Sequence, residues 1–255
     1  MEELETMRWE KDGQVARVTL NRPRLLNAMN NQATFDLNTV ADRISADPSI
    51  RVVTITGAGR AFCTGIDLKE IAAGKIDITY HDHWEGALRK FETMEPIVLC
   101  LIHGYCLGGG LQLAMASDIR ISTPLAKIGL PAIRESLIPG LGTWRLPRFV
   151  GMGRARWMIL SGENIDGEEA ARIGLADHLV SQDKYRDEFE EYVGKYLRIC
   201  SKGSRMAKLA TNRAFDLDFK DFYEEYIQLQ AVAMTSADFH EAAAAYREKR
   251  DPEWE

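Results

Sequence analysis

Hydrophobic and polar positions follow two different periods along the first half of the chain. Short apolar runs rich in β-branched residues predict strands at 15–20, 51–56 and 97–102. A helix is predicted over 33–44, because its apolar residues recur at helical spacing on one face. Strand–turn–helix passages of this kind recur between residues 15 and 120. We therefore expect an α/β fold with buried, largely parallel strands.

Later segments add shorter elements with clear ends. A helix is expected to begin at Asp166, whose side chain forms a capping box with Glu169, and to end at Gly174. Residues 74–85 show no clear period, so we interpret them as a loop. The remaining predicted elements are strands at 118–122 and 127–130 and helices at 86–94 and 154–161.

Charged helices dominate the C-terminal part of the chain. The last helix is predicted from Asp238 to Arg250, with Asp238 and Glu241 as its capping box. Its apolar face is small and needs another surface to pack against. We therefore divide the chain into a core at 1–195 and a helical region at 196–255 that folds over the core or over a neighbouring subunit.

Composition narrows the class of protein. Of the 255 residues, 45% are hydrophobic and 27% are charged, as in ordinary soluble globular proteins. The formal net charge of −6 disfavours nucleic acid or an anionic membrane surface as the main partner. The longest apolar run, Ile97 to Ile102, is far shorter than a membrane span, and the N-terminal residues are acidic and lack the apolar segment of a signal peptide.

The cysteines point to the compartment. They are scattered without a CxxC pair, so we expect neither a metal site nor a disulfide framework, and we place the protein in the reducing cytoplasm. The residues concerned are Cys63, Cys100, Cys106 and Cys200.

A glycine-rich segment at 103–114 carries the strongest functional signal. A buried strand enters it, Gly108, Gly109 and Gly110 follow, and a helix leaves it. Adjacent glycines permit positive φ and leave no Cβ between a ligand and the backbone. The first N–H groups of the helix lack intrahelical partners and suit an anion. Neither GK[ST] nor GxGxxG is present, which excludes the common phosphate loops. A tight turn without a ligand is the alternative interpretation.

Several motifs in the same order resemble those of the enoyl-CoA hydratase/isomerase family, also called the crotonase superfamily. The resemblance covers nearly the full length. It implies a spiral of ββα turns with a C-terminal helical trimerisation region, and trimers that commonly pair as hexamers. The segments that carry it are 21–28, 62–68, 103–114, 138–143 and 247–252.

The resemblance also implies a substrate and a binding site. The substrate is an acyl-CoA thioester, so coenzyme A belongs to the substrate and no tightly bound cofactor is expected. By motif position, the backbone N–H groups of Ile66 and Gly109 form an oxyanion hole, which stabilises an enolate. The implied coenzyme A contacts are Arg24, Leu25, Thr64, Ile66, Lys69 and Lys249. For Lys69 and Lys249, ordinary surface charge is the alternative interpretation.

Two positions depart from the family pattern. Hydratases of the family carry a glutamate two residues after the glycine triplet and another after the proline of the next segment. Here these residues are Gln112 and Ala132. Glutamine can hold a water or a carbonyl by hydrogen bonds, but it cannot activate water or deliver a proton. We therefore doubt ordinary hydratase activity and expect a non-standard acid/base set.

Three side chains are candidates for the missing acid/base groups. Glu135 lies on the same face as Ala132 if 131–136 forms a helical turn; a solvated pair with its arginine neighbour is the alternative. His81 and His83 lie in the segment that closes over the acyl group in this family, where an exposed loop is the alternative. The His81–His83 spacing resembles a metal-ligand pair but lacks a third ligand.

Two classes of function remain open on the sequence. The first is an enzyme acting on a CoA thioester as an isomerase, hydrolase, decarboxylase or hydratase of an unusual substrate. The second is a non-catalytic acyl-CoA-binding protein. The intact oxyanion motifs favour the enzyme, because a binding protein has less need of them.

Asp67 is expected to cap the helix that it opens, without a chemical role.

Overall fold

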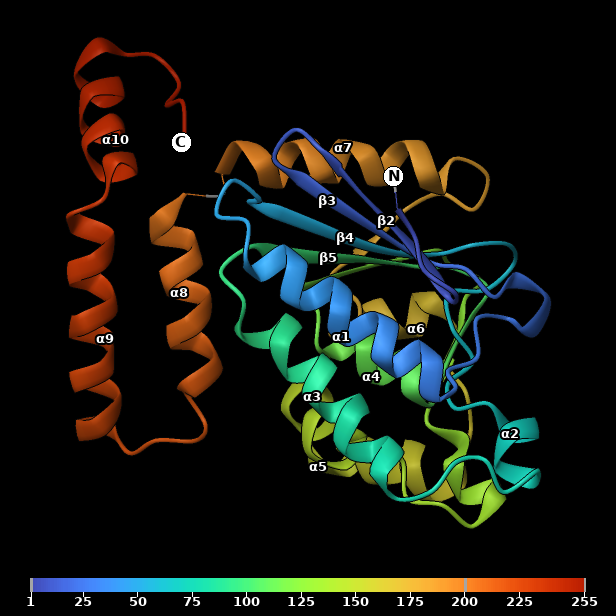
Figure 1. Cartoon of the computed structure of the whole chain (residues 1–255). Coiled ribbons are helices and arrows are strands. Elements are labelled where there is room, and N and C mark those ends of the chain that lie inside the picture. The colour runs from blue at the N-terminus through green and yellow to red at the C-terminus, as the bar shows by residue number, and fades with distance from the viewer. Residues whose placement is uncertain (1, 200, 255) are drawn as a thin grey trace.

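A sheet of seven strands organises the body of the molecule (Figure 1). The structure is a computed structural model that describes residues 2–199 and 201–254, so Cys200 lies outside the described residues. The strand order is β1-β2-β3-β4-β5-β7-β9, antiparallel up to β3 and parallel from β3 onward. The strands are β1 (Glu2–Glu3), β2 (Met7–Asp12), β3 (Val15–Leu20), β4 (Val52–Gly57), β5 (Ile97–Ile102), β7 (Ile119–Ser122) and β9 (His178–Leu179). The four sheet strands predicted from the sequence are confirmed.

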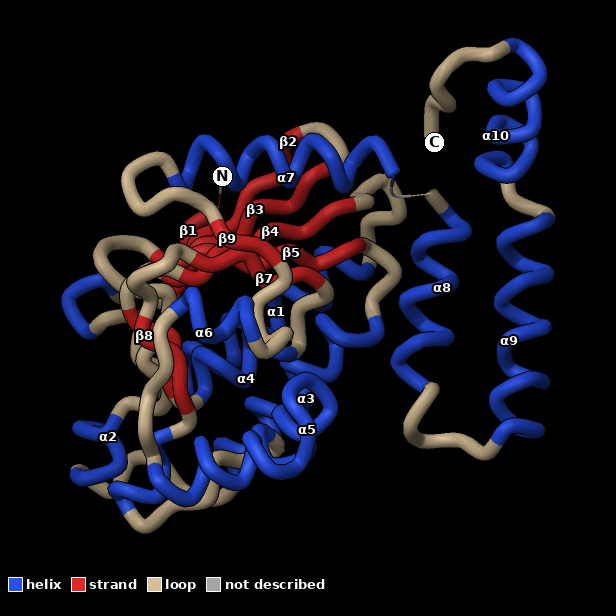
Figure 2. Tube along the Cα trace, turned by 180° about the vertical axis from the view of Figure 1, so that it is seen from behind, coloured by secondary structure: helices blue, strands red, loops and turns tan. Residues whose placement is uncertain are grey.

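The sheet is buried on both faces, as expected for parallel strands. Along β3, Ala16 and Val18 belong to the larger apolar cluster, whereas Val15 belongs to a second cluster on the opposite face. Helix α7 (Tyr185–Ile199) covers that second face. Figures 1 and 2 show the other helices of the body on the far side of the sheet. They are α1 (Asn31–Ser45), α2 (Leu68–Ala72), α3 (Thr79–Thr93), α4 (Gly109–Met115), α5 (Gly142–Ser161) and α6 (Gly167–Arg172).

Helix α3 corrects the loop predicted at 74–85. Residues 79–85 are helical, and the predicted helix at 86–94 is the second half of the same element. The prediction was wrong because the apolar face is aromatic at its start and polar histidines and an aspartate separate its members. That face repeats the spacing of α1 and consists of Tyr80, Trp84, Ala87, Leu88 and Phe91.

Capping decides the ends of several helices. The Asp166 carboxylate accepts a hydrogen bond from the Glu169 N–H, so the predicted start of α6 is confirmed. The predicted cap at Asp238 is wrong. Ser236 caps α10 (Ala237–Glu248) by accepting from the Phe239 N–H, while Asp238 accepts from the backbone N–H of Lys202, the first residue of α8 (Lys202–Arg213).

A second, smaller sheet carries the glycine segment. It pairs β6 (Tyr105–Leu107) with β8 (Lys127–Gly129) in parallel. The predicted strand at 127–130 is confirmed as β8. The predicted helix at 154–161 lies in the second half of α5, which contains a non-helical glycine, Gly151, that bends it.

Three C-terminal helices form an arm beside the body (Figure 1). They are α8 (Lys202–Arg213), α9 (Phe219–Met234) and α10. Helix α8 is held to the body by the Lys208 ammonium, which lies 2.8 Å from the Asp118 carboxylate and 2.8 Å from the carbonyl oxygen of Pro96. The boundary predicted at residue 196 falls inside α7, and the arm begins after that helix.

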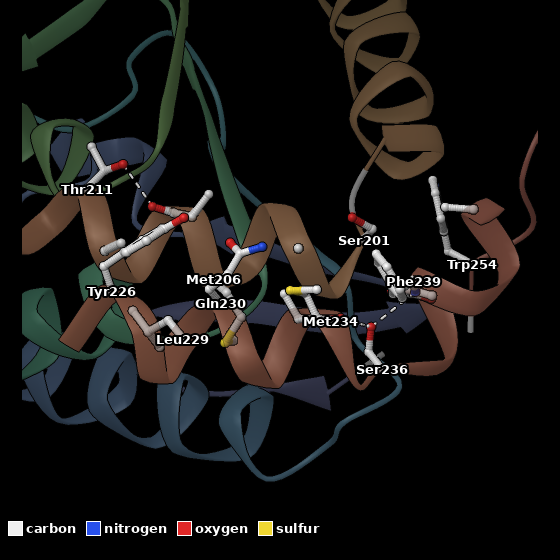
Figure 3. A pocket seen from close by; sticks show the side chains of 16 residues that line it. Ser201, Met206, Thr211, Tyr226, Leu229, Gln230, Met234, Ser236, Phe239 and Trp254 are labelled. Atoms are coloured by element: carbon white, nitrogen blue, oxygen red, sulfur yellow. Dashed lines mark hydrogen bonds between the residues drawn. The ribbon is translucent and has the colours of Figure 1, made fainter. Parts of the chain in front are cut away.

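The arm leaves apolar surface uncovered. Helix α9 contributes no fully buried residue, and the Phe219 and Tyr246 side chains are 83% and 88% exposed. A cavity of about 390 Å³ opens between the three helices, and Figure 3 shows the side chains that line it. Its larger lining side chains are Met206, Tyr226, Leu229, Met234, Phe239 and Trp254. Within the described parts of the chain, no helix has both the length and the apolar character needed to cross a bilayer.

Candidate functional site

Two chain segments that are far apart in sequence run side by side at the carboxyl ends of the parallel strands. The segment after β4 lies along β6, where the Cys63 N–H donates to the Tyr105 carbonyl at 3.0 Å. In return, the Leu107 N–H donates to the Cys63 carbonyl at 2.9 Å. These bonds bring the turn that contains Gly65 against the glycines that open α4.

Glycine is required where the two turns meet. A Cβ on Gly65 would lie 2.8 Å from both the Gly109 nitrogen and the Leu107 carbonyl oxygen, and Gly65 itself has a φ of +87°. A Cβ on Gly110 would lie 2.3 Å from the Cys63 carbonyl oxygen. Both distances are too short for a side chain, so this contact is made by backbone alone.

Two backbone amides remain without acceptors at this contact. Among residues 2–199 and 201–254, no hydrogen-bond acceptor lies within reach of the Ile66 or Gly109 N–H. Their neighbours are paired: the Gly65 carbonyl accepts from Met29 at 2.7 Å, and the Gly108 N–H donates to Gly129 at 2.9 Å. The two free N–H groups are therefore held on a fixed frame.

A cavity of about 520 Å³ adjoins these amides and brings together most of the predicted site residues. One wall comes from the short 3₁₀ helix Pro23–Leu25 and another from α2 (Leu68–Ala72). The predicted site residues that line the cavity are Arg24, Leu25, Thr64, Ile66, Lys69 and Glu135, and Gly108 and Ala132 lie among them.

Asn27 fastens the first of these walls to the turn. It is buried, and its side-chain nitrogen lies 2.8 Å from the Ala61 carbonyl oxygen and 3.1 Å from that of Phe62. Its backbone has a φ of +58°, which asparagine tolerates better than most residues. Sequence reasoning missed this role; an asparagine two residues after the short helix Pro23–Leu25 was the available signal.

Asp67 takes the capping role expected from the sequence. Its carboxylate accepts from the Lys69 and Glu70 backbone N–H groups and so begins α2, which carries Lys69 to the cavity. The same carboxylate lies 3.1 Å from the Arg22 guanidinium. The ion pair ties α2 to the loop that carries Arg24.

Similarity to known proteins shows the family to which the chain belongs. A model of the enoyl-CoA hydratase/isomerase family matches residues 10–255. The chain is 35% identical over 257 residues to a probable enoyl-CoA hydratase of Mycobacterium tuberculosis, with 98% of each chain covered. It is 33% identical over 255 residues to the short-chain-enoyl-CoA hydratase of Clostridium acetobutylicum, with 97% of each covered. The chain belongs to the enoyl-CoA hydratase/isomerase family.

The fold agrees with this assignment. The crystal structure of an enoyl-CoA hydratase from Bacillus anthracis superposes on the chain with a TM-score of 0.91 at 29% identity. The match covers 98% of this chain and 99% of that one. The crotonase-type α/β fold and its C-terminal helices, expected from the sequence, are confirmed.

Glu135 lies at the end of the short helix that also contributes Ala132 to the cavity. Residues Pro131–Glu135 form a 3₁₀ helix, so the helical turn expected there is confirmed. In a 3₁₀ helix the side chains at i and i+3 eclipse each other. Glu135 and Ala132 therefore lie on the same side of this short helix, and both line the cavity, with Glu135 exposed.

Gln112 is buried on α4, three residues after Gly109. It is only 5% exposed, and its side-chain oxygen has no hydrogen-bond partner within the described part of the chain. It faces the Gly140–Gly142 turn, since a Cβ on Gly140 would lie 2.9 Å from that oxygen. Burying an unsatisfied acceptor is unfavourable. The residue is therefore a candidate for contact with a ligand.

Trp84 packs against the backbone of Gly109. Its ring would lie 3.3 Å from a Cβ on Gly109, and it stacks on Tyr80 with 6.4 Å between ring centroids. Both rings are buried. Burial raises the pKa of the Tyr80 hydroxyl, which is therefore neutral at physiological pH. These aromatic side chains belong to the core that supports the start of α4.

Four predicted residues do not line this cavity: Gly109 and Gln112, which lie on α4, and His83 and Lys249. The exposed His83 packs its ring edge-on against Phe35 on α1, with 6.4 Å between centroids. Lys249 follows α10 in the arm, at the opposite end of the molecule from α2 in Figure 1. Within one chain, neither His83 nor Lys249 joins the site. The described residues contain no group of three histidine, cysteine or acidic side chains placed to hold a metal ion.

The buried Cys63 thiol is expected to be unreactive. Burial raises its pKa to about 12, so it stays protonated near neutral pH and is a poor nucleophile. Its Sγ lies 3.1 Å from the Asn27 carbonyl oxygen. Cys63 is therefore part of the frame beneath the turns.

The contact between the turns predicts the outcome of Gly65→Ala. A methyl group there meets the Gly109 nitrogen, and the backbone must keep a positive φ, so we expect a loss of stability of about 1–3 kcal/mol. Urea unfolding followed by circular dichroism measures this. Gly74→Ala is the matched control, because Gly74 has a φ of +66° but open space around its Cβ position. Equal losses in the two variants would contradict a steric role for the contact.

Proposed function

We propose that the protein is an enzyme that acts on an acyl-CoA thioester through the backbone N–H groups of Ile66 and Gly109. The observation that carries the proposal is the presence of two fixed amides without acceptors beside a cavity of about 520 Å³. When a proton leaves the α-carbon of an acyl thioester, negative charge develops on the carbonyl oxygen. Two aimed donors stabilise that charge, and one such donor is typically worth about 10²–10³ in kcat.

The cavity walls suit the coenzyme A part of the substrate. Arg24, Arg60 and Lys69 line it, although the chain as a whole is acidic. Guanidinium and ammonium groups bind phosphates by charge-assisted hydrogen bonds. The similarity to a probable enoyl-CoA hydratase of M. tuberculosis and to the short-chain-enoyl-CoA hydratase of C. acetobutylicum supports a CoA thioester as the ligand.

Glu135 is the proposed acid/base group. Its carboxylate takes a proton from the α-carbon, the C–H electron pair moves into the enolate, and the oxygen is held by the two amides. With a β,γ-unsaturated acyl chain the enolate is a conjugated dienolate, and proton transfer from Glu135 to the γ-carbon moves the double bond to the α,β position. This step completes an isomerisation and returns Glu135 to its carboxylate form. A positioned carboxylate contributes about 10²–10⁴ in rate. Gln112 and Ala132 supply neither of the expected hydratase groups.

Glu135→Gln separates the catalytic function from simple acyl-CoA binding. Deuterium exchange at the α-carbon of butyryl-CoA, followed by mass spectrometry, needs only the base and the oxyanion donors. We expect the variant to exchange at least ~10²-fold more slowly than the wild type, with little change in affinity.

Glu168→Gln, which removes an exposed charge on α6, is the control and should exchange normally. Exchange that persists undiminished in Glu135→Gln would remove Glu135 from the mechanism. Binding of butyryl-CoA without exchange in the wild type would instead favour the non-catalytic acyl-CoA-binding protein.

Hydration of crotonyl-CoA should be slow, because Gln112 and Ala132 stand where the two glutamates of a hydratase are expected. Loss of the enoyl-thioester absorbance measures the rate. Introducing Gln112→Glu and Ala132→Glu together should raise it by ~10²-fold or more. A wild-type rate within about tenfold of a family hydratase would show that another carboxylate already activates water.

We also propose that the arm assembles the protein into a trimer or a pair of trimers. The exposed aromatic and apolar side chains of α9 and α10 are too extensive for a free surface. Multi-angle light scattering at micromolar concentration should give the mass of three or six chains. Tyr223→Lys with Ile227→Lys should lower that mass, whereas Gln228→Lys on another side of α9 should not. A wild-type monomer would contradict the assembly.

A further inference from the structure

His103, at the junction of β5 and the glycine segment, is a buried titratable residue that the proposed mechanism does not use. The residue is 5% exposed, and its Nε2 atom lies 3.2 Å from the Gly59 carbonyl oxygen. Because a carbonyl oxygen can only accept, Nε2 carries the hydrogen and donates it to Gly59. The Nδ1 atom has no hydrogen-bond partner among the described residues. The ring therefore makes its hydrogen bond to the loop that follows β4.

Two side chains hold this loop, which spans residues 58–62. The Asn27 side-chain nitrogen contacts three of its carbonyl oxygens, and His103 binds a fourth, that of Gly59. The backbone of the two segments is also in direct contact, since a Cβ on Gly104 would lie 1.9 Å from the Arg60 carbonyl oxygen. The position of the loop therefore depends on the His103 ring.

The loop acts on two cations of the cavity wall. Arg60 itself lines the cavity. On another side of the loop, a Cβ on Gly59 would lie 2.9 Å from the Cβ of Pro23, the first residue of the short helix that carries Arg24. Among residues 2–199 and 201–254, neither arginine forms an ion pair with a carboxylate, so both are available to the phosphates of a ligand. His103 is thus connected through Gly59 to the wall proposed to bind coenzyme A.

The surroundings of the ring are apolar or positively charged. The His103 and Tyr185 rings stack with 5.2 Å between their centroids. The other ionisable residues on the segments packed against His103 are Arg186, next to Tyr185, Arg60 in the loop, and Lys127, whose N–H donates at 2.6 Å to the backbone of the residue after His103. Within the described part of the chain, no carboxylate forms an ion pair with the ring. A proton on His103 would therefore add a buried charge without a counter-ion.

These surroundings favour the neutral ring. Burial lowers the pKa of His103 below the ordinary value of 6.5, and the charge of Arg186 acts in the same direction. The carbonyl oxygens of Gly59 and Leu101 oppose this shift but do not cancel it. A state in which the ring reaches water takes up a proton more readily than the packed state does. The packed state is therefore fully stable above about pH 6.5 and loses stability as the pH falls below that value.

We propose that His103 is a positioning residue that makes the binding of coenzyme A thioesters depend on pH. The neutral ring holds the Gly59 carbonyl, and with it the wall that carries Arg24 and Arg60. A protonated ring favours states in which it contacts water, so Gly59 is released and the wall loosens. The inference rests on the proposed function, because it assigns the two arginines to the phosphates of an acyl-CoA.

The affinity for S-butyl-CoA tests the coupling without turnover, because this thioether lacks the thioester carbonyl. It is measured by isothermal titration calorimetry at about pH 7.5 and about pH 5.5, on either side of the ordinary titration of histidine. His103→Gln keeps a side-chain N–H donor and does not titrate. We expect this variant to bind like the wild type at the higher pH. At the lower pH the wild type should lose about fivefold more affinity than the variant, and the phosphates of the ligand contribute equally to both losses.

Two further variants locate the effect. His103→Met removes the donor and should bind more weakly than the wild type at the higher pH, without the additional loss at the lower pH. His178→Gln is the matched control, because His178 is a half-buried histidine that stacks on Tyr192 and does not line the cavity. It should keep the pH dependence of the wild type. Thermal unfolding verifies that each variant is folded.

Amide hydrogen exchange without ligand measures the loop directly. After correction for the intrinsic effect of pH on exchange, the protection of residues 57–66 in the wild type should fall by about threefold or more from the higher to the lower pH. The same segment should keep its protection in His103→Gln. This measurement is independent of the identity of the ligand.

The possible results separate the two proposals. Equal losses of affinity in the wild type and His103→Gln, or unchanged protection of the loop in the wild type, would overturn the coupling and leave acyl-CoA binding standing. A pH dependence that disappears in His178→Gln would also overturn it, because the sensor would then lie elsewhere. Absence of binding of both S-butyl-CoA and free coenzyme A at the higher pH would overturn the proposed function, and the coupling with it.

Discussion

The close approach of two backbone turns at Gly65 and Gly109 is the constraint on which the site depends. No side chain fits between them, and hydrogen bonds from Cys63 and Leu107 hold the two segments in register. Parallel strands bring their carboxyl ends to one edge of the sheet, so turns distant in sequence meet there. The buried sheet supplies the rigidity that such a contact needs, and Asn27 extends it to the wall that carries Arg24.

Placing the donors on the backbone separates two parts of the chemistry. The Ile66 and Gly109 N–H groups do not depend on the identity of their side chains, so substitutions elsewhere leave them in place. Acid/base groups, in contrast, are side chains on the surrounding turns and can change or move individually. The sequence is consistent with such a change, because the two expected glutamates are replaced by Gln112 and Ala132 and a glutamate is present nearby at Glu135. The proposed enzyme therefore keeps the family's means of stabilising charge with another arrangement of proton carriers.

The buried polar side chain of Gln112 is unfavourable for the stability of the folded protein. An unsatisfied buried acceptor typically costs about 1–3 kcal/mol. The Glu85–Arg145–Glu92 cluster lies next to it, and its carboxylates come from the helix that also positions Trp84 over Gly109. One helix thus supports the start of α4 and supplies both carboxylates of this cluster. The C-terminal arm makes no comparable contribution within a single chain, since its apolar faces are turned outward.

Local patterns in the sequence determined the elements whose signals are short in range. The strands β3, β4, β5 and β7, the apolar face of α1 and the cap at Asp67 follow from periodicity and from bonds within a few residues. The 3₁₀ turn that places Glu135 on the same side as Ala132 is of the same kind.

The tertiary structure alone decided the features whose partners are distant. The carboxylate of Asp238 is engaged by the backbone of Lys202, so it does not cap α10, and the first turn of α3 is defined by the core against which its aromatic face packs. Asn27 and Glu85 acquire their positions from segments more than thirty residues away. Such contacts carry no local period, because they form only when the sheet has brought its edges together.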